Sequence, residues 1–211
     1  QFNIMGDTQD SELMMKIIRT RYPHAFIGMV GISAGSGQLV SYLGKSSEDC
    51  IANAAASLCP AYDISKAFDT LGDFFSKYLT NCMQDLFIKN NKQILIEEHG
   101  QEKFEKISSS KLMGEFINNH HIFTGCKSIE EYWEESNPVK VFEGNKIPCM
   151  ILNSLDDPIC VKENILFDMF AKFKNYVLLT TEVGSHIAFM EGKFANESWM
   201  ERVTMDWLES C

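Results

Sequence analysis

One short motif places a serine where it could act as a nucleophile. Ser33 is the centre of the pentapeptide Gly31-Ile32-Ser33-Ala34-Gly35, which has the pattern GxSxG. A serine hydroxyl is a poor nucleophile at neutral pH, so it needs a base within hydrogen-bond reach and a carboxylate that orients the base. In GxSxG the serine occupies a tight strand-to-helix turn, and the glycines remove side chains that would clash there. We therefore expect Ser33 to be a nucleophile, with the backbone N–H of Ala34 as one donor to an oxyanion.

A carboxylate and a histidine follow later in the chain. Asp156 and Asp157 come after an apolar run that predicts a strand, and two adjacent acids usually point in different directions. We favour Asp157 as the orienting acid, because it directly precedes Pro158 and the next predicted helix, and we keep Asp156 as the alternative. Among the five histidines, only His186 lies in a small-residue loop directly after a predicted strand. The order Ser33, Asp157, His186 is the nucleophile–acid–base order of α/β hydrolases.

The other histidines and the cysteines form no recognisable site. The seven cysteines are an odd number and include no CxxC pair, which argues against a disulfide framework or a zinc site. His120 and His121 are adjacent, so their side chains diverge, and no third metal ligand is apparent; surface or core roles suit them better. We therefore expect free thiols in a reducing compartment, an intracellular location, and neither a metal nor an organic cofactor.

The charge balance and hydropathy limit the classes of partner. The formal net charge of -10 argues against a nucleic-acid partner, which needs a basic face. No apolar run reaches the roughly 18 residues of a membrane span. Because the chain opens with Gln1, we interpret it as a fragment, and any N-terminal signal or anchor would lie upstream.

The hydrophobic pattern alternates between predicted strands and helices at both ends of the chain. Apolar runs predict strands at 26–30, 51–58, 149–153 and 176–180, while helical spacing marks 13–18, 39–43, 163–173 and 197–208. Between them, a polar and irregular stretch with helical spacing includes a predicted short helix over 128–135. This order predicts a mostly parallel sheet flanked by helices, with a helical insertion. We divide the chain into hydrolase core 1–62 with the nucleophile, helical cap 63–138, and hydrolase core 139–211 with the acid and histidine loops.

The sequence resembles the YheT-like, abhydrolase-domain-containing lipase family of α/β hydrolases. The resemblance runs almost from end to end, and only the region from about 68 to 123 matches poorly. The matching stretches are Phe2-Asn3, Gly6-Asp7-Thr8-Gln9-Asp10, Arg21-Tyr22-Pro23-His24-Ala25, Gly31-Ile32-Ser33-Ala34-Gly35, Tyr42-Leu43-Gly44, Gly125, Ser128, Glu131-Tyr132, Ser136, Asp156-Asp157-Pro158 and Gly184-Ser185-His186-Ile187-Ala188-Phe189-Met190-Glu191-Gly192.

The resemblance implies an α/β-hydrolase fold and a triad of Ser33, Asp157 and His186. It also implies carboxylic-ester substrates, with acylglycerols or phospholipids for the eukaryotic branch, whose members often carry an N-terminal membrane anchor. Ser36 and Ser185 stand where the family often has glycine. Family members have further strands before the point where this chain begins, and a preceding loop donates the second oxyanion N–H. We therefore expect the N-terminal strands and that donor to be missing here.

The sequence thus predicts a serine hydrolase that acts through an acyl-enzyme on a small-molecule or lipid ester, either as an acylglycerol or phospholipid lipase or as a short-chain carboxylesterase. Two alternatives stay open: a thioesterase or peptidase on the same fold, and a non-catalytic or truncated homologue. In the predicted cap, apolar residues are candidates to line an acyl pocket, although helical spacing also fits plain core. These candidates are Phe74, Phe75, Leu86 and Phe87.

Overall fold

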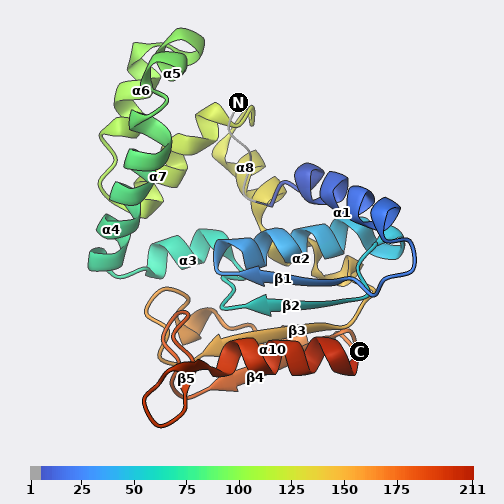
Figure 1. Cartoon of the computed structure of the whole chain (residues 1–211). Coiled ribbons are helices and arrows are strands. Elements are labelled where there is room, and N and C mark those ends of the chain that lie inside the picture. Colours follow the sequence, from blue (N-terminus) through green and yellow to red (C-terminus); the bar gives the residue numbers. More distant parts are fainter. Residues whose placement is uncertain (1–5) are drawn as a thin grey trace.

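A four-stranded parallel sheet forms the centre of the fold in the computed structural model, which describes residues 6–211 (Figure 1). Phe2-Asn3, part of the family resemblance, lies outside the described residues. The strands lie in the order β1-β2-β3-β4, and each neighbouring pair is parallel. The mostly parallel sheet predicted from the sequence is confirmed, and the carboxyl ends of all four strands meet at one edge. The strands are β1 (Gly28–Ile32), β2 (Ala54–Leu58), β3 (Cys149–Ser154) and β4 (Tyr176–Thr181).

Helices cover the two faces of the sheet because buried side chains alternate along the central strands. Ala55 and Ile151 pack in one core cluster with helix α2 (Ala34–Ser46) and the single-turn helix α9 (Phe167–Phe170). The neighbouring residues Ala56 and Met150 point the other way and pack against helix α10 (Trp199–Ser210). Since β3 is buried along its whole length, this layering explains why the sequence of β3 is continuously apolar before its last two residues.

Helix α2 also makes a close backbone contact with the 3-10 helix η4 (Pro138–Gly144). A Cβ atom on Gly144 would lie 2.0 Å from the carbonyl oxygen of Gly44, and one on Gly44 would lie 2.2 Å from the carbonyl oxygen of Val141. Both positions therefore need glycine. This contact fixes the point at which the chain re-enters the sheet layer after its helical part.

The helical segment 63–138 separates β2 from β3 in the chain, and its helices α4 to α7 stand away from the sheet (Figure 1). It has its own buried cluster, which includes Ile107, Phe123 and Tyr132. The sequence-based division of the chain at 62 and 138 stays a prediction. The elements are α3 (Ile64–Thr70), α4 (Asp73–Met83), the π-helix η2 (Gln84–Lys89), α5 (Lys92–His99), α6 (Gln101–Ser108), α7 (Met113–His120), η3 (His121–Phe123) and α8 (Ile129–Ser136).

Two apolar patterns near the N-terminus are less buried than the sequence predicts. The strand expected at 26–30 begins two residues later as β1. Because β1 is an edge strand of the described sheet, Val30 and Ile32 are exposed. In helix α1 (Gln9–Arg21), Met15 is buried, while Leu13 and Ile17 of the predicted apolar face point to the surface. Among the described residues, nothing covers these side chains, so periodicity identified the elements correctly but not their degree of burial.

The C-terminal part departs from prediction at two places. The helix expected at 163–173 is reduced to the 3-10 turn η5 (Lys162–Asn164) and α9, because Ile165 and Phe170 both enter the core and this packing overrides helix propensity. A short antiparallel pair, β5 (Met190–Glu191) and β6 (Glu197–Ser198), precedes α10 and was not predicted. Within residues 6–211, no helix combines the length and apolar character that a membrane crossing requires.

Candidate active site

Ser33 occupies the sharp turn between β1 and α2. Its φ of +53° lies in the left-handed region, which a non-glycine residue adopts only when the surroundings hold it there. The N–H of Ser33 donates to the carbonyl oxygen of Leu58 over 2.9 Å. The carbonyl oxygen of Ser33 accepts hydrogen bonds from the N–H and the buried hydroxyl of Ser36. The backbone is therefore fixed on both sides of the serine, and Ser36 has a structural partner where the family often has glycine.

The two glycines of the pentapeptide are not equivalent. A Cβ atom on Gly31 would lie 2.4 Å from the carbonyl oxygen of Gly35, so the turn closes only because Gly31 lacks a side chain. A Cβ atom on Gly35 would meet no atom of the described residues within 4 Å. The steric reason predicted for both glycines thus holds for Gly31 alone.

His186 lies between Ser33 and Asp157, so the structure brings together the three residues selected from the sequence. Ser33 Oγ is 2.7 Å from His186 Nε2, and His186 Nδ1 is 2.8 Å from Asp157 Oδ2. The Asp157 side chain is fully buried, and its other oxygen accepts the N–H groups of Ile159 (2.7 Å) and Cys160 (2.9 Å). These bonds orient the carboxylate, which in turn fixes the imidazole with Nδ1–H donating to Asp157 and Nε2 free to accept from Ser33.

Asp156, the alternative acid, does not face the imidazole. It is exposed, and its Oδ1 accepts the N–H of Ser185 over 2.7 Å and the hydroxyl of Ser154. The structure therefore selects Asp157 from the two adjacent acids as the partner of His186. The contact from Asp156 to the histidine loop was missed at the sequence level, where the only available signal was the adjacency of the two acids.

Two buried thiols lie close to this arrangement without sharing its chemistry. Cys160 Sγ, a carboxylate oxygen of Asp157 and a ring nitrogen of His186 lie within 4.8 Å of one another. Burial, with the nearby Asp157 carboxylate adding to it, raises the pKa of Cys59 to about 12 and also raises the pKa of Cys160. Both groups are therefore protonated thiols at neutral pH, which are weak nucleophiles. All seven cysteines are free.

A cavity of about 510 Å³ extends from Ser33 and Ala34 into the helical segment. Its walls are mainly apolar, and among the four cap residues proposed from the sequence only Phe87 lines it. Phe74 and Leu86 point to solvent, and Phe75 packs on the core of the segment, because their helix faces turn away from the cavity. The apolar side chains that line it include Ala61, Ile64, Ala67, Phe68, Leu71, Leu79, Met83, Phe87, Met113, Phe116, Ile117 and Ile159.

His120 also lines the cavity, which sequence reasoning did not predict. It lies one helical turn after Phe116, and the two rings stack with centroids 6.2 Å apart. Burial, together with the neighbouring His121, lowers the pKa of His120 to about 4. The imidazole is therefore neutral at pH 7 and adds no charge to the cavity wall.

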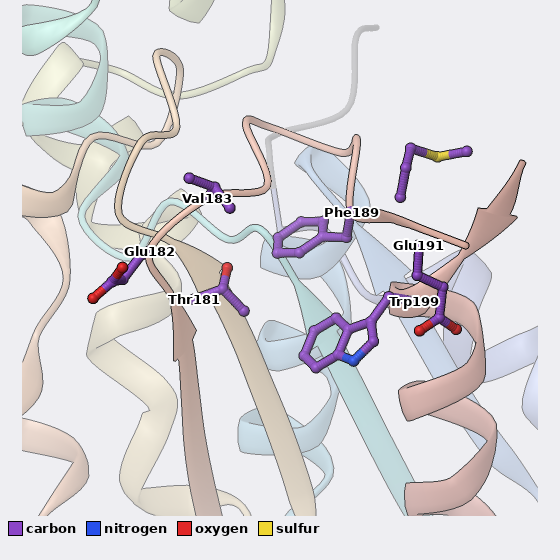
Figure 2. Close-up of a pocket in the computed structure, with 7 residues that line it drawn as sticks. Thr181, Glu182, Val183, Phe189, Glu191 and Trp199 are labelled. Carbon is purple, nitrogen blue, oxygen red and sulfur yellow. The ribbon is translucent and has the colours of Figure 1, made fainter. Parts of the chain in front are cut away.

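A second cavity, of about 250 Å³, lies next to the loop 184–188 that carries His186, which we call the histidine loop. It is lined by residues 181–183 and 189–191 on either side of this loop and by Trp199 (Figure 2). Figure 2 shows the rings of Phe189 and Trp199 facing each other, with centroids 6.2 Å apart and planes 22° from parallel. A Cβ atom on Gly184 would lie 2.6 Å from the Phe189 ring, so that ring fits under the loop only because Gly184 has no side chain. The aromatic pair thus supports the loop that carries His186.

The fold agrees with comparisons to known proteins. The sequence model of the family described as "Serine aminopeptidase, S33", in which S33 is the family's designation, matches residues 5–188. The chain belongs to this family of α/β hydrolases. This α/β hydrolase spans about half the length of the curated relatives it matches.

Two human relatives illustrate those matches. Phospholipase ABHD3 of Homo sapiens is 25% identical over 212 residues, which cover 97% of this chain and 51% of the relative. Monoacylglycerol lipase ABHD2 of Homo sapiens is 24% identical over 227 residues, which cover 96% of this chain and 52% of the relative. Both lie within the abhydrolase group that the sequence motifs resemble.

Solved structures with the same fold include a peptidase and an esterase. The Pyrococcus horikoshii acylaminoacyl peptidase matches with a TM-score of 0.60 and 15% identity, over 97% of this chain and 28% of the peptidase. The Pyrococcus furiosus esterase Pf2001 matches with a TM-score of 0.53 and 14% identity, over 100% of this chain and 64% of the esterase. At such identities the likeness shows the α/β-hydrolase fold alone.

Proposed function

We propose that this α/β hydrolase cleaves carboxylic esters through Ser33, His186 and Asp157, and that its substrates are lipid esters such as acylglycerols or phospholipids. The observation that carries the proposal is the continuous hydrogen-bond chain from Ser33 Oγ through His186 to Asp157, at 2.7 Å and 2.8 Å. Ser33, at one end of this chain, lines an apolar cavity. The two human relatives, a phospholipase and a monoacylglycerol lipase by name, support the lipid class.

The first half of the reaction forms an acyl-enzyme. Ser33 Oγ attacks the ester carbonyl carbon while its proton passes to His186 Nε2. Asp157 stabilises the imidazolium that results, through the hydrogen bond at Nδ1. The carbonyl oxygen becomes an oxyanion that accepts from the N–H of Ala34, the first residue of α2, whose N–H has no partner within the helix. Collapse of this intermediate expels the alcohol, which takes the proton from Nε2.

The second half releases the acid. A water molecule donates a proton to His186 Nε2 and attacks the acyl carbon, and the new intermediate collapses to return Ser33 to its hydroxyl form. The left-handed conformation of Ser33 matters in both halves, because it presents the hydroxyl at the end of the sheet, where His186 and the N-terminus of α2 converge.

The cavity favours an acyl chain over a polar group. Its wall beyond Ser33 consists largely of aliphatic and aromatic side chains, and His120 within it is neutral at pH 7. Burying methylene groups there is favourable by roughly 0.8 kcal/mol each. A free ammonium group, which an aminopeptidase must bind, would find a single carboxylate among the lining residues, that of Asp7.

Labelling with a fluorophosphonate probe tests the nucleophile. The native protein should be labelled at Ser33, and Ser33→Ala should not. The control Ser109→Ala removes an exposed serine that directly follows helix α6, and this variant should be labelled like the wild type. Failure of the folded wild-type protein to react would contradict the proposal in favour of a non-catalytic homologue.

A substrate panel tests the class of bond and of acyl group. The protein should hydrolyse p-nitrophenyl esters of medium and long acyl chains and monoacylglycerols, with a higher kcat/KM for these than for acetate esters. Preference for acyl thioesters or for aminoacyl anilides over oxygen esters would instead support the thioesterase or the peptidase reading of the same three residues.

A further inference from the structure

The two adjacent acids after β3 make different contacts with the same histidine loop. Asp157 binds the imidazole of His186, whereas Asp156 binds the backbone just before it. The N–H of Ser185 donates to Asp156 Oδ1 over 2.7 Å, and the hydroxyl of Ser154 donates to the same oxygen. Asp156 therefore links the end of β3 to the loop that follows β4.

The backbone that Asp156 holds is in a conformation that needs support. Ser185 has a φ of +52°, which a residue with a side chain rarely adopts. The N–H of Ala188 also donates to the carbonyl oxygen of Gly184 at 3.0 Å, which closes the turn around Ser185. The bond from the Ser185 N–H to Asp156 therefore helps to hold a left-handed conformation in the residue directly before His186.

The acceptor is a carboxylate rather than a neutral group. The hydroxyl of Ser154 and the N–H of Ser185 hold the pKa of Asp156 below its usual range, so the group is ionised throughout the neutral pH range. Hydrogen bonds to an ionised acceptor are stronger than neutral ones. The main chain next to Asp156 is also fixed. The N–H of Leu155 donates to the carbonyl oxygen of Thr181 over 2.8 Å, which continues the β3–β4 ladder.

We propose that Asp156 is a positioning residue, which fixes the main chain at Ser185 and thereby holds His186 between Asp157 and Ser33. The effect of Asp156 on catalysis rests on the proposed function, whereas its effect on the position of His186 does not. Asp157 sets the direction of the imidazole ring, and Asp156 sets the place from which the ring projects. Asp156 and Asp157 thus make different contacts with the histidine loop, and neither can replace the other.

Three variants separate the hydrogen bond from the charge. Asp156→Ala removes both, Asp156→Asn keeps an oxygen that accepts from Ser185 but removes the charge, and Glu182→Ala removes an exposed charge three residues before Ser185. The first readout is the NMR signal of the His186 Nδ1 proton in protein labelled with ¹⁵N-histidine. The bond to Asp157 shifts this signal strongly downfield, whether or not the protein turns over substrate.

The expected pattern is loss or a marked upfield shift of that signal in Asp156→Ala, and its retention in Asp156→Asn and Glu182→Ala. The second readout is ester hydrolysis, where Asp156→Ala should lower kcat on the order of tenfold to a hundredfold at unchanged KM, while Asp156→Asn recovers most of kcat. Thermal unfolding of each variant checks that the fold persists.

The results distinguish this inference from the proposed function. A normal Nδ1 signal and normal kcat in Asp156→Ala, or absence of the downfield signal in the wild type, overturn the positioning role even if Ser33 is labelled by the probe. Conversely, if the signal depends on Asp156 but the wild type neither reacts with the probe nor cleaves esters, positioning holds and the proposed function fails.

Discussion

The side-chain amide of Asn137 donates to a carboxylate oxygen of Asp63 over 2.9 Å, and this bond joins the two ends of the helical segment 63–138. Asn137 Oδ1 also accepts the N–H of Ile64 at 3.4 Å. The hydroxyl of Ser65 and the Lys66 ammonium approach the same aspartate. These bonds hold together the two points at which the chain enters and leaves the segment, and a further hydrogen bond from Asn164 Nδ2 to Thr70 Oγ1 links the segment to the C-terminal part.

Breaking this bond should destabilise the protein. Asn137 is almost fully buried, so Asn137→Ala leaves Asp63 and the Ile64 N–H with fewer partners and should lower the free energy of unfolding by about 1–3 kcal/mol. Asn137→Asp should cost more at pH 7, because it sets a second carboxylate against Asp63. Urea denaturation measures both effects. The control Asn90→Ala removes an exposed amide and should stay within about 0.5 kcal/mol of wild type.

The same bond has a defined pH dependence. Burial raises the pKa of Asp63, but hydrogen bonds from Ser65 and Asn137 outweigh it and hold the pKa below its usual range. Because the folded pKa is below the unfolded one, the stabilisation is present above about pH 4 and is lost as the pH falls through the folded pKa. Asp63→Asn should therefore flatten the stability curve in this acidic window. An unchanged curve would show that the Asp63 carboxylate contributes nothing to stability.

The pentapeptide glycines should respond differently to alanine. Gly31→Ala forces a Cβ atom to within 2.4 Å of the Gly35 carbonyl oxygen and should lower the free energy of unfolding by about 1–3 kcal/mol. Gly35→Ala has open space among the described residues and lies in a helix, where alanine is favoured over glycine by up to about 1 kcal/mol. Equal losses of stability from the two substitutions would contradict this difference.

Narrowing the large cavity should change acyl-chain preference. Ala67 lines the cavity and is buried, so Ala67→Leu places additional methyl groups in the space that we assign to the acyl chain. We expect kcat/KM for long-chain esters to fall on the order of tenfold, while acetate esters are cleaved as before. Ala171→Leu, at an exposed position after α9, is the matched control. A uniform loss across all chain lengths would argue that the cavity does not hold the acyl chain.

The titration of His120 should lower the free energy of unfolding as the pH falls. The effect should begin at a higher pH than the effect of the carboxylates. Burial lowers its pKa from 6.5 to about 4, so below pH 6.5 the unfolded chain binds a proton that the folded protein does not. Stability should decrease from pH 6.5 to 4 by about 3 kcal/mol from this group. His120→Phe removes the titration and should be less sensitive over that range, as measured by denaturation at successive pH values. Parallel curves for the two proteins would contradict the prediction.

The sequence indicated Ser33, Asp157 and His186 more accurately than it indicated the contacts and the cavity wall around them. Ser33, Asp157 and His186 could be selected because each follows a predicted strand, and parallel strands bring their carboxyl ends together. The pairing of Asp156 with Ser185 could not be predicted, because it depends on the register between β3 and β4. The cavity wall was mostly misassigned, since Phe74 and Leu86 have the spacing of buried residues but face solvent. Spacing identifies a helix face, but only packing shows what that face contacts.

The parallel ladder between β3 and β4 also limits how this protein can vary. Ser154 pairs with Thr181, and within a few residues the chain after each strand reaches Asp156, Asp157 and His186. A single-residue insertion or deletion there would exchange inward and outward side chains and present the wrong acid to the imidazole. The turn at 192–196, between β5 and β6, carries no such constraint. Length variation among natural or engineered descendants should therefore be tolerated in that turn and be rare between Ser154 and Pro158.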